Sequence, residues 1–183
     1  MRYAQVRSMD ISNGENIGVS LFVQGCPFNP HCYNCFNTET WDFNGGKEWM
    51  PETKEKFLEL IDRPYIKRVS LLGGEPLADE NLDGVLDLIT TIKKEFSQKT
   101  IWIYSGYTWD QIMNPVVTDD FNPSRDELIR KRQDIIKQCT IIVDGRYIDS
   151  QRDITLKWRG SANQRVIDIK KSLEQDRVVL YCD

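Results

Sequence analysis

The sequence predicts an α/β protein built around a parallel sheet. Short runs rich in β-branched residues alternate with helical patterns along the chain, which is typical of strand–helix–strand units. These runs are almost continuously apolar, as expected of parallel strands with both faces covered. The expected strands lie at residues 19–23, 69–72, 100–104 and 140–143. With a less regular tail, they leave two architectures open: a doubly wound sheet or a partial barrel.

Amphipathic helices are expected between these strands. The first covers Pro51–Ile61, because proline suits the first turn of a helix and apolar side chains recur on one side. The second covers residues 82–96, where apolar residues follow at three- and four-residue steps. These residues are Leu82, Val85, Leu86, Ile89 and Phe96.

A third helix is expected to open with a capping box formed by Ser124 and Glu127. It would bury Leu128, Ile129, Ile135 and Ile136. Residues 166–173 fit a strand or a helix equally well. Residues 110–124 form the most irregular stretch, and they are either a contact surface for a partner or a plain solvated connection.

Length and charge limit the class of protein. The chain has 183 residues, which favours a single domain over 1–183. Its 24 basic and 28 acidic side chains give a net charge of −4 without a basic block, so nucleic acid is not an expected partner. No apolar run approaches the ~18 residues of a membrane span, and the N-terminus lacks an apolar signal segment. A cytoplasmic protein without membrane contact is expected.

The carboxyl ends of the four expected strands share a pattern. Each strand runs into glycine combined with a polar or metal-binding side chain. The four sequences are Gly25-Cys26, Gly73-Gly74-Glu75-Pro76, Ser105-Gly106-Tyr107 and Asp144-Gly145-Arg146. Ligands of parallel α/β sheets sit at this edge, so four such ends in succession predict one shared site.

Three cysteines in the first strand-to-helix loop indicate a metal centre. Cys26, Cys32 and Cys35 have the spacing C-x5-C-x2-C, and the odd total of five cysteines argues against a disulfide scaffold. Zinc would need a fourth ligand, which His31 could supply only awkwardly from beside Cys32. A cubane iron–sulfur cluster held by three thiolates would instead leave one iron open to an outside ligand.

The glycine-rich turn favours the iron–sulfur alternative. Gly73 and Gly74 present bare backbone to an approaching ligand, and the carboxylate of Glu75 could receive an ammonium group. A structural zinc site has no use for such a turn. An open iron that binds a small zwitterion would use such a turn to hold that ligand.

Several sequence blocks resemble one family. They are Gly25-Cys26-Pro27, residues 32–37 with Thr40-Trp41, residues 73–76, residues 105–109, residues 143–146 and residues 159–165. At these blocks the chain resembles the radical S-adenosylmethionine superfamily, and within it the activating proteins of anaerobic ribonucleoside-triphosphate reductase. The family usually spaces its cysteines C-x3-C-x2-C, and more often has glycine where this chain has Asn34. Two extra loop residues cost under about 1 kcal/mol in closure entropy, so the same three ligands can converge.

The resemblance implies a fold, an activity and partners. The fold would be a partial, open parallel β/α barrel. One [4Fe-4S] cluster would bind S-adenosyl-L-methionine and cleave it reductively to methionine and a 5′-deoxyadenosyl radical. That radical would remove a hydrogen from a glycine of the reductase, and a flavodoxin or ferredoxin would supply the electron. No catalytic acid–base residue is needed.

The resemblance also implies roles for single residues. Cys26, Cys32 and Cys35 would ligate the cluster, Asn34 and Phe36 would lie over the adenosyl group, and Gly73, Gly74 and Glu75 would contact the amino-acid end of S-adenosylmethionine. Ser105 would hydrogen-bond the same molecule. His31 is interpreted as loop surface rather than a catalyst. Asp144 and Arg146 either pair with each other or meet the partner, Cys139 is read as a buried thiol, and Cys182 as part of a frayed end.

Two alternatives stay open at this point. The chain could activate another glycyl-radical enzyme of the formate-lyase type, although it lacks the cysteine-rich insert that such activases often carry. It could also be a zinc-stabilised binding module that uses Cys26, His31, Cys32 and Cys35.

Overall fold

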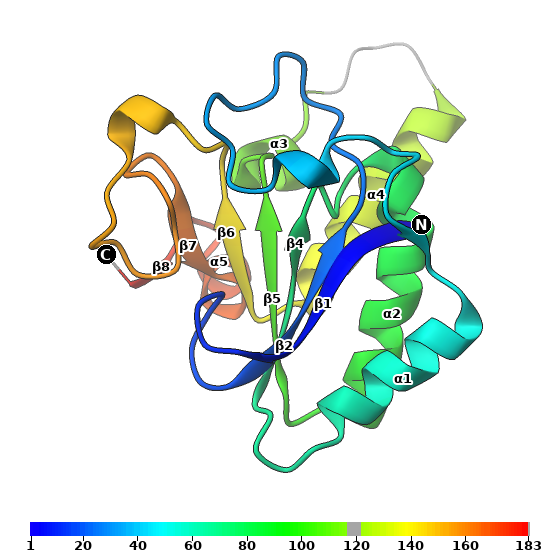
Figure 1. Cartoon of the computed structure of the whole chain (residues 1–183). Helices are drawn as coiled ribbons and strands as arrows, with labels where there is room; N and C mark the ends of the chain where they lie inside the picture. Colours follow the sequence, from blue (N-terminus) through cyan, green and yellow to red (C-terminus); the bar gives the residue numbers. More distant parts are fainter. Residues whose placement is uncertain (117–121, 183) are drawn as a thin grey trace.

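The chain folds around one twisted sheet in a computed structural model that describes residues 1–116 and 122–182 (Figure 1). The strand order in the described part is β3-β1-β2-β4-β5-β6-β7-β8. The strands are β1 (Arg2–Asp10), β2 (Gly18–Val23), β3 (Lys47–Glu48), β4 (Arg68–Gly73), β5 (Thr100–Ser105), β6 (Ile141–Asp144), β7 (Arg165–Asp168) and β8 (Leu180–Cys182). The helices are α1 (Pro51–Ile61), α2 (Leu82–Glu95), α3 (Trp109–Met113), α4 (Pro123–Gln138) and α5 (Ile169–Gln175), with short 3-10 turns η1 (Thr38–Thr40), η2 (Asp79–Asn81) and η3 (Asp149–Gln151).

The four predicted parallel strands form the centre of the sheet. β2, β4, β5 and β6 pair in parallel, and one row across them runs through Ser20, Ser70, Trp102 and Ile141. The flanking strands are antiparallel: β1 and β3 on the β2 side, β7 and β8 on the β6 side. Of these flanking strands, β7 overlaps residues 166–173, for which a strand was one of two predictions, whereas β1, β3 and β8 were not predicted because they are short or half exposed and lack a continuous apolar run.

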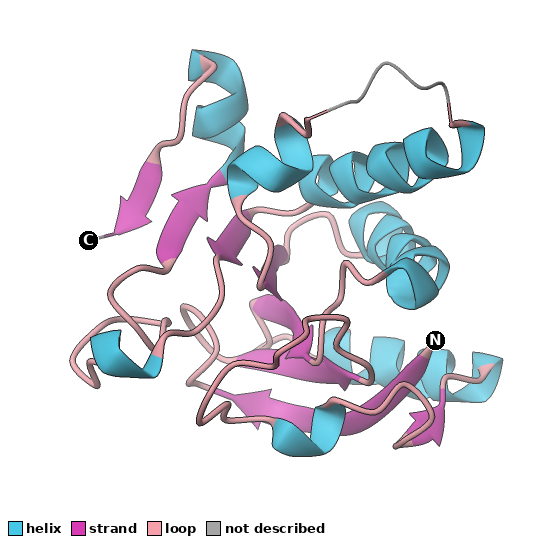
Figure 2. Cartoon of the chain, turned by 90° about the horizontal axis from the view of Figure 1, so that it is seen from above, coloured by secondary structure: helices cyan, strands magenta, loops and turns pink. Residues whose placement is uncertain are grey.

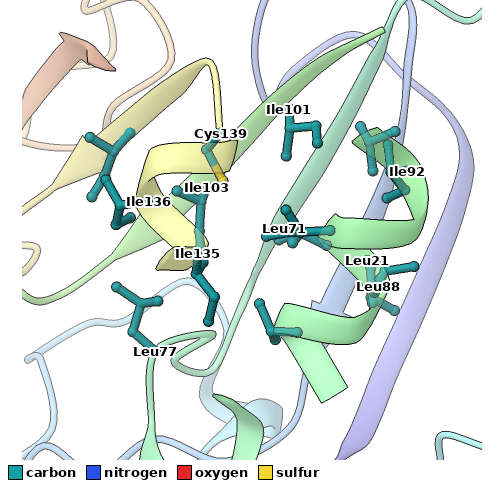
Figure 3. Packing of buried hydrophobic residues seen from close by; sticks show 14 of the residues in the cluster. Leu21, Leu71, Leu77, Leu88, Ile92, Ile101, Ile103, Ile135, Ile136 and Cys139 are labelled. Atoms are coloured by element: carbon teal, nitrogen blue, oxygen red, sulfur yellow. The ribbon is translucent and has the colours of Figure 1, made fainter. Parts of the chain in front are cut away.

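Helices cover one face of the sheet, so the doubly wound alternative is wrong. Leu21, Leu71 and Ile103 point to that face and pack against α2 and α4, as Figure 3 shows. The opposite face carries a smaller apolar cluster around Trp102 and polar residues such as Arg68. Viewed from above, the strands follow an arc around this second face (Figure 2). The open, largely parallel partial barrel is therefore the fold.

Two helix predictions are confirmed and one start is corrected. α1 has the predicted bounds, with Pro51 in its first turn, and α2 ends one residue before the predicted end. The cap of α4 is Asn122, whose side chain accepts a hydrogen bond from the Arg125 N–H at 3.1 Å, so the capping box at Ser124 is wrong. Pro123 explains the difference, because proline fits the first helical position and places the cap one residue earlier.

Other parts of α4 and the tail also differ from the prediction. Ile135 and Ile136 are buried as expected, but Leu128 and Ile129 are only partly buried. Residues 166–173 are both strand and helix: β7 ends at Asp168, whose side chain caps α5 by accepting from the Lys171 N–H at 3.0 Å. Part of the irregular stretch 110–124 belongs to α3, and residues 117–121 lie outside the described residues.

A buried ion pair ties the first hairpin to the parallel strands. Arg68 of β4 is fully buried and donates to the Asp10 carbonyl at 2.6 Å and to the Ser70 hydroxyl at 2.9 Å. The carboxylate of Asp10 lies 3.5 Å away and also accepts from the backbone of Ser12 and Asn13. In the described part of the chain, no helix is long and apolar enough to cross a membrane.

Candidate metal and cofactor site

A cavity of about 580 Å³ lies at the carboxyl ends of the parallel strands. Cys26, Gly73, Ser105 and Gly145 each bring a different strand end to its wall. The four strand ends therefore meet at one cavity, as predicted, because parallel strands present their carboxyl ends at the same edge of the sheet.

The cysteine loop after β2 is held by backbone hydrogen bonds. The N–H of Gly25 donates to the Thr40 carbonyl at 2.8 Å, and that of Cys26 donates to the Trp41 carbonyl at 3.0 Å. Cys26, Cys32 and Cys35 are free thiols, half-buried, and all three line the cavity. The loop thus brings three thiols, which are possible metal ligands, to the same cavity.

The environment of the Cys26 thiol disfavours its thiolate unless a cation is bound. Burial raises the pKa of the Cys26 thiol to about 11, and nearby Glu75, Cys32 and Cys35 add to the effect. A bound cation reverses such a shift, because it stabilises the thiolate. Within the described residues, no three His, Cys, Asp or Glu side chains are arranged to hold a single metal ion. A cubane takes each thiolate on a different iron and so accepts more widely separated sulfurs, whereas the zinc alternative needs a tight tetrahedron.

The cysteine loop, with its longer first spacing, packs on the neighbouring strand ends. Phe28 packs on Tyr107, with ring centroids 5.0 Å apart, and Arg146 hydrogen-bonds the Pro30 carbonyl. His31 stacks on Trp41 with ring centroids 4.2 Å apart, and its Nε2 atom is buried. His31 is a partly exposed loop residue with one ring face against Trp41.

Glu75 forms the buried polar centre of the opposite wall. Its carboxylate accepts from the Ser105 hydroxyl at 2.9 Å, the Gly106 N–H at 2.7 Å and the Leu77 N–H at 2.9 Å. Burial raises its pKa to about 7, although these three hydrogen bonds lower it. The side chain thus joins two strand ends while carrying a carboxyl group that a nearby cation would ionise.

Glycine is required beside Glu75 by packing. A Cβ at Gly74 would lie 2.2 Å from the Gly25 carbonyl oxygen, so the two strand-end turns touch backbone to backbone. Gly73 and Gly74 both line the cavity. Ser105 also lines it, and its hydroxyl accepts from the Tyr107 N–H at 3.1 Å while donating to Glu75.

Of the two residues expected over an adenosyl group, Phe36 lines the cavity and Asn34 does not. Phe36 lines the cavity and packs on Tyr147, with ring centroids 5.0 Å apart. Asn34 does not line it, since its side-chain amide donates to the Asp149 carboxylate at 3.2 Å. Asn34 has a φ of 53°, in the left-handed region that asparagine tolerates better than most residues.

Asp144 pairs with Arg165, so the alternative in which it pairs with Arg146 is wrong. The Asp144 carboxylate accepts from Arg165 at 3.0 and 2.5 Å and from the Trp109 N–H at 2.7 Å. Antiparallel pairing of β6 with β7 places Arg165 directly opposite Asp144. The antiparallel pairing of β7 therefore decides the partner, while Arg146 turns to the cysteine loop.

The block at residues 159–165 anchors the turn that precedes β7. Gln164 accepts from the Gly160 N–H at 3.0 Å and donates to the Gly145 carbonyl at 2.9 Å. Asn163 donates to the Arg146 carbonyl at 2.8 Å. This network places Arg159, Gly160 and Gln164 on the cavity wall. Only the resemblance singled out this block beforehand.

Sequence reasoning missed the far side of the cavity. Its lining there comes from β1 and the following turn, from β5 and from the segment before β7. The residues are Arg7, Ser12, Asn13, Tyr104, Leu156 and Trp158. No local signal marks them, because β1 is not a predicted strand and residues 152–158 have no regular pattern.

Three cysteines on the wall of a cavity at the strand ends are the arrangement expected of an iron–sulfur protein. Consistent with it, the family described as "4Fe-4S single cluster domain" matches residues 12–167, and the chain belongs to it. It is 34% identical over 166 residues to the anaerobic ribonucleoside-triphosphate reductase-activating protein of Vibrio cholerae, covering 90% of this chain and 96% of the relative. The proteins of that name in Escherichia coli K12 and Enterobacteria phage T4 are 32% and 29% identical over 168 residues, 91% of this chain and 97% and 93% of theirs. The chain belongs to the anaerobic ribonucleoside-triphosphate reductase-activating proteins of the radical S-adenosylmethionine type.

Proposed function

We propose that this chain cleaves S-adenosylmethionine reductively and generates the glycyl radical on anaerobic ribonucleoside-triphosphate reductase. One observation carries the proposal: Cys26, Cys32 and Cys35 share a cavity with the glycine-rich turn of β4. The relatives aligned over nine-tenths of this chain bear the name of that activity. Neither the formate-lyase alternative nor the zinc module has comparable support.

Cys26, Cys32 and Cys35 would hold the [4Fe-4S] cluster. When bound, the cluster supplies one electron that breaks a carbon–sulfur bond of S-adenosylmethionine, giving methionine and a 5′-deoxyadenosyl radical. Trp41 and Phe36 line the cavity beside the cysteine loop, and a bound S-adenosylmethionine packed against them would leave less room for water. The chain's own residues would therefore bind and orient the cluster and S-adenosylmethionine and shield them from water.

The amino-acid end of S-adenosylmethionine would lie against the turn of β4. Gly73 and Gly74 expose backbone there, and Glu75 brings the only carboxylate among the described residues that line the cavity. An ammonium group beside Glu75 would lower its raised pKa and keep the carboxylate ionised. Ser105 orients that carboxylate through its hydroxyl. Asn34 could contribute only through its backbone, because its side chain is engaged with Asp149.

The electron donor and the location remain predictions. A flavodoxin or ferredoxin would have to approach the cysteine loop, where Tyr33 and Phe36 are exposed apolar side chains. Such small, transient interfaces suit electron transfer. A cytoplasmic location would bring the chain together with these donors and with the reductase.

Anaerobic reconstitution tests the proposed function. About four irons and four acid-labile sulfides per chain are expected, with release of 5′-deoxyadenosine when S-adenosylmethionine and dithionite are added. A glycyl radical should then appear by electron paramagnetic resonance on the reductase and not on a formate-lyase. One zinc per chain without sulfide, or a cluster that never consumes S-adenosylmethionine, would contradict the proposal. A glycyl radical that forms only on the formate-lyase would identify that enzyme, and not the reductase, as the substrate.

A further inference from the structure

The cavity lies between two segments of the chain, β1 and residues 152–160. Arg7 of β1 lies on one side, and Leu156 and Arg159 lie on the other. Within the described residues, no hydrogen bond, ion pair or strand pairing connects β1 to residues 152–160. The strand arc also leaves β3 and β8 at opposite ends of the sheet, with β1 next to the two-residue β3 (Figure 2). Arg7 thus brings the cavity wall next to one end of the sheet.

β1 carries a free backbone edge at this flank. It pairs with β2 along its length, whereas β3 covers only Arg2 and Tyr3 on the other side. Residues 4–10 have no second strand partner among the described residues. Register shifts before Gln5 and after Arg7 limit the regular stretch to residues 5–7, enough to pair with a short strand but short enough to discourage open-ended aggregation.

The chemistry of the substrate residue calls for backbone recognition. Glycine has no side chain, so a site that selects one glycine must bind the flanking backbone or the neighbouring residues. Addition of an extended peptide to a sheet edge does this, because main-chain hydrogen bonds provide affinity and alternate residues face opposite sides. A glycine in such a strand can direct its Cα toward the cavity without obstruction.

The side chains beside this edge suit an extended peptide. Arg7 stacks over the Phe22 ring at 4.5 Å, keeps a side chain 43% exposed and lies 3.9 Å from the Asp10 carboxylate that Arg68 already engages. Its guanidinium can therefore bind a carbonyl or carboxylate of a guest. Met9 is 63% exposed and Ile11 76% exposed, which offers apolar contact on the same flank.

From these features we infer that the glycine-bearing segment of the reductase docks by adding a strand to the free edge of β1. This inference rests on the proposed function and specifies how its macromolecular substrate binds. The guest strand runs beside residues 5–9, and its glycine reaches the cavity between Arg7 and the segment at 156–159.

Hydrogen exchange tests the backbone contact directly. The reconstituted protein is mixed with the purified reductase, and amide exchange is followed by mass spectrometry. Exchange in residues 4–9 should slow by about tenfold or more, as newly formed backbone hydrogen bonds require, while α5 serves as an internal control. A complex that forms and leaves residues 4–9 unprotected would overturn the inference.

Two substitutions test the same contact by function. Ser8→Pro removes an N–H at a residue that has no register partner in β2, and Met9→Asp places a charge on the exposed flank. Each should slow glycyl-radical formation by about tenfold, comparable to the loss of one or two hydrogen bonds. Release of 5′-deoxyadenosine without reductase should stay within about twofold of the parent. Leu173→Asp on α5 is the matched control at an exposed apolar position.

The outcomes separate this inference from the proposed function. A parent protein that cleaves S-adenosylmethionine and activates the reductase, with both variants equally active, disproves strand addition and leaves the function standing. A parent protein that never forms the glycyl radical disproves both. Should Ser8→Pro lose its far-ultraviolet circular dichroism, Met9→Asp and the exchange experiment decide.

Discussion

Glu75 combines a structural and a binding role in one buried carboxyl group. Its three hydrogen-bond donors come from its own turn and from the end of β5, so it connects two strand ends. Burial nevertheless outweighs those donors and raises its pKa to about 7. A group of this kind responds strongly to a cation, which is what the amino-acid end of S-adenosylmethionine would bring.

The raised pKa predicts how stability depends on pH. The unfolded carboxyl loses its proton near 4.5, whereas the folded one keeps it until about 7. Between these values the folded state holds more protons, so the free energy of unfolding falls as pH rises, by about 3 kcal/mol in total. Urea unfolding of the metal-free, reduced protein from pH 4.5 to 8 measures this slope.

Glu75→Gln is the control for that slope. Its amide does not titrate, so the fall attributable to position 75 should vanish even if the variant is less stable at every pH. Equal slopes in both proteins would show that Glu75 keeps an ordinary pKa.

The cysteines predict a second, residue-level result. Cys35→Ser should lose most of its bound iron and its charge-transfer absorbance, because a serine hydroxyl is a poor iron ligand beside two thiolates. Cys139→Ala should retain iron, since Cys139 lies in the main hydrophobic core and burial raises its pKa. Iron and sulfide per chain are the measurement, and comparable iron in both variants would contradict the ligand assignment.

At the scale of elements, short polar contacts set where helices begin. α4 starts at Pro123 because Asn122 caps it, and α5 starts where β7 ends because Asp168 caps it. α3 carries the one complete capping box among the described helices, formed by Thr108 and Gln111. These caps orient the connections that lead to the cavity edge.

The cap of α4 can be tested with a matched pair. Asn122→Ala should lower the free energy of unfolding by about 1 kcal/mol, since the Arg125 N–H loses its acceptor. Ser124→Ala, inside the first turn, should change it by less than about 0.5 kcal/mol. Chemical denaturation measures both, and a larger effect at Ser124 would restore the capping box that the structure replaces.

At the scale of the whole molecule, the first hairpin is attached to the parallel strands through buried charge. Arg68 is fully buried and depends on Asp10 and Ser70 for its hydrogen bonds. Burial lowers the pKa of Arg68, while Asp10 opposes that effect. This pair holds β1, and hence one flank of the cavity, in place.

Breaking this pair should destabilise the fold strongly. Asp10→Ala leaves the Arg68 cation buried with only neutral partners, so a loss of about 3–5 kcal/mol is expected. Arg68→Met together with Asp10→Asn removes both charges and should cost markedly less. Melting temperatures of the two variants compare them, and equal losses would mean that the charges contribute little.

The sequence determined the parts that depend on local pattern. Apolar runs ending in glycine located the four parallel strands and the shared edge, and the spacing of Cys26, Cys32 and Cys35 indicated the metal centre that we propose there. Residues close in sequence report on each other directly, since their geometry is set by a few backbone angles. The resemblance then supplied the family.

Only the tertiary structure decided the rest. It covered one face of the sheet rather than two, paired Asp144 with Arg165 instead of Arg146, and stacked His31 on Trp41. It also brought Arg7 and Arg159 to the same cavity. Each of these results joins segments distant in the chain, and such contacts depend on the register and curvature of the whole sheet, which no short stretch of sequence encodes.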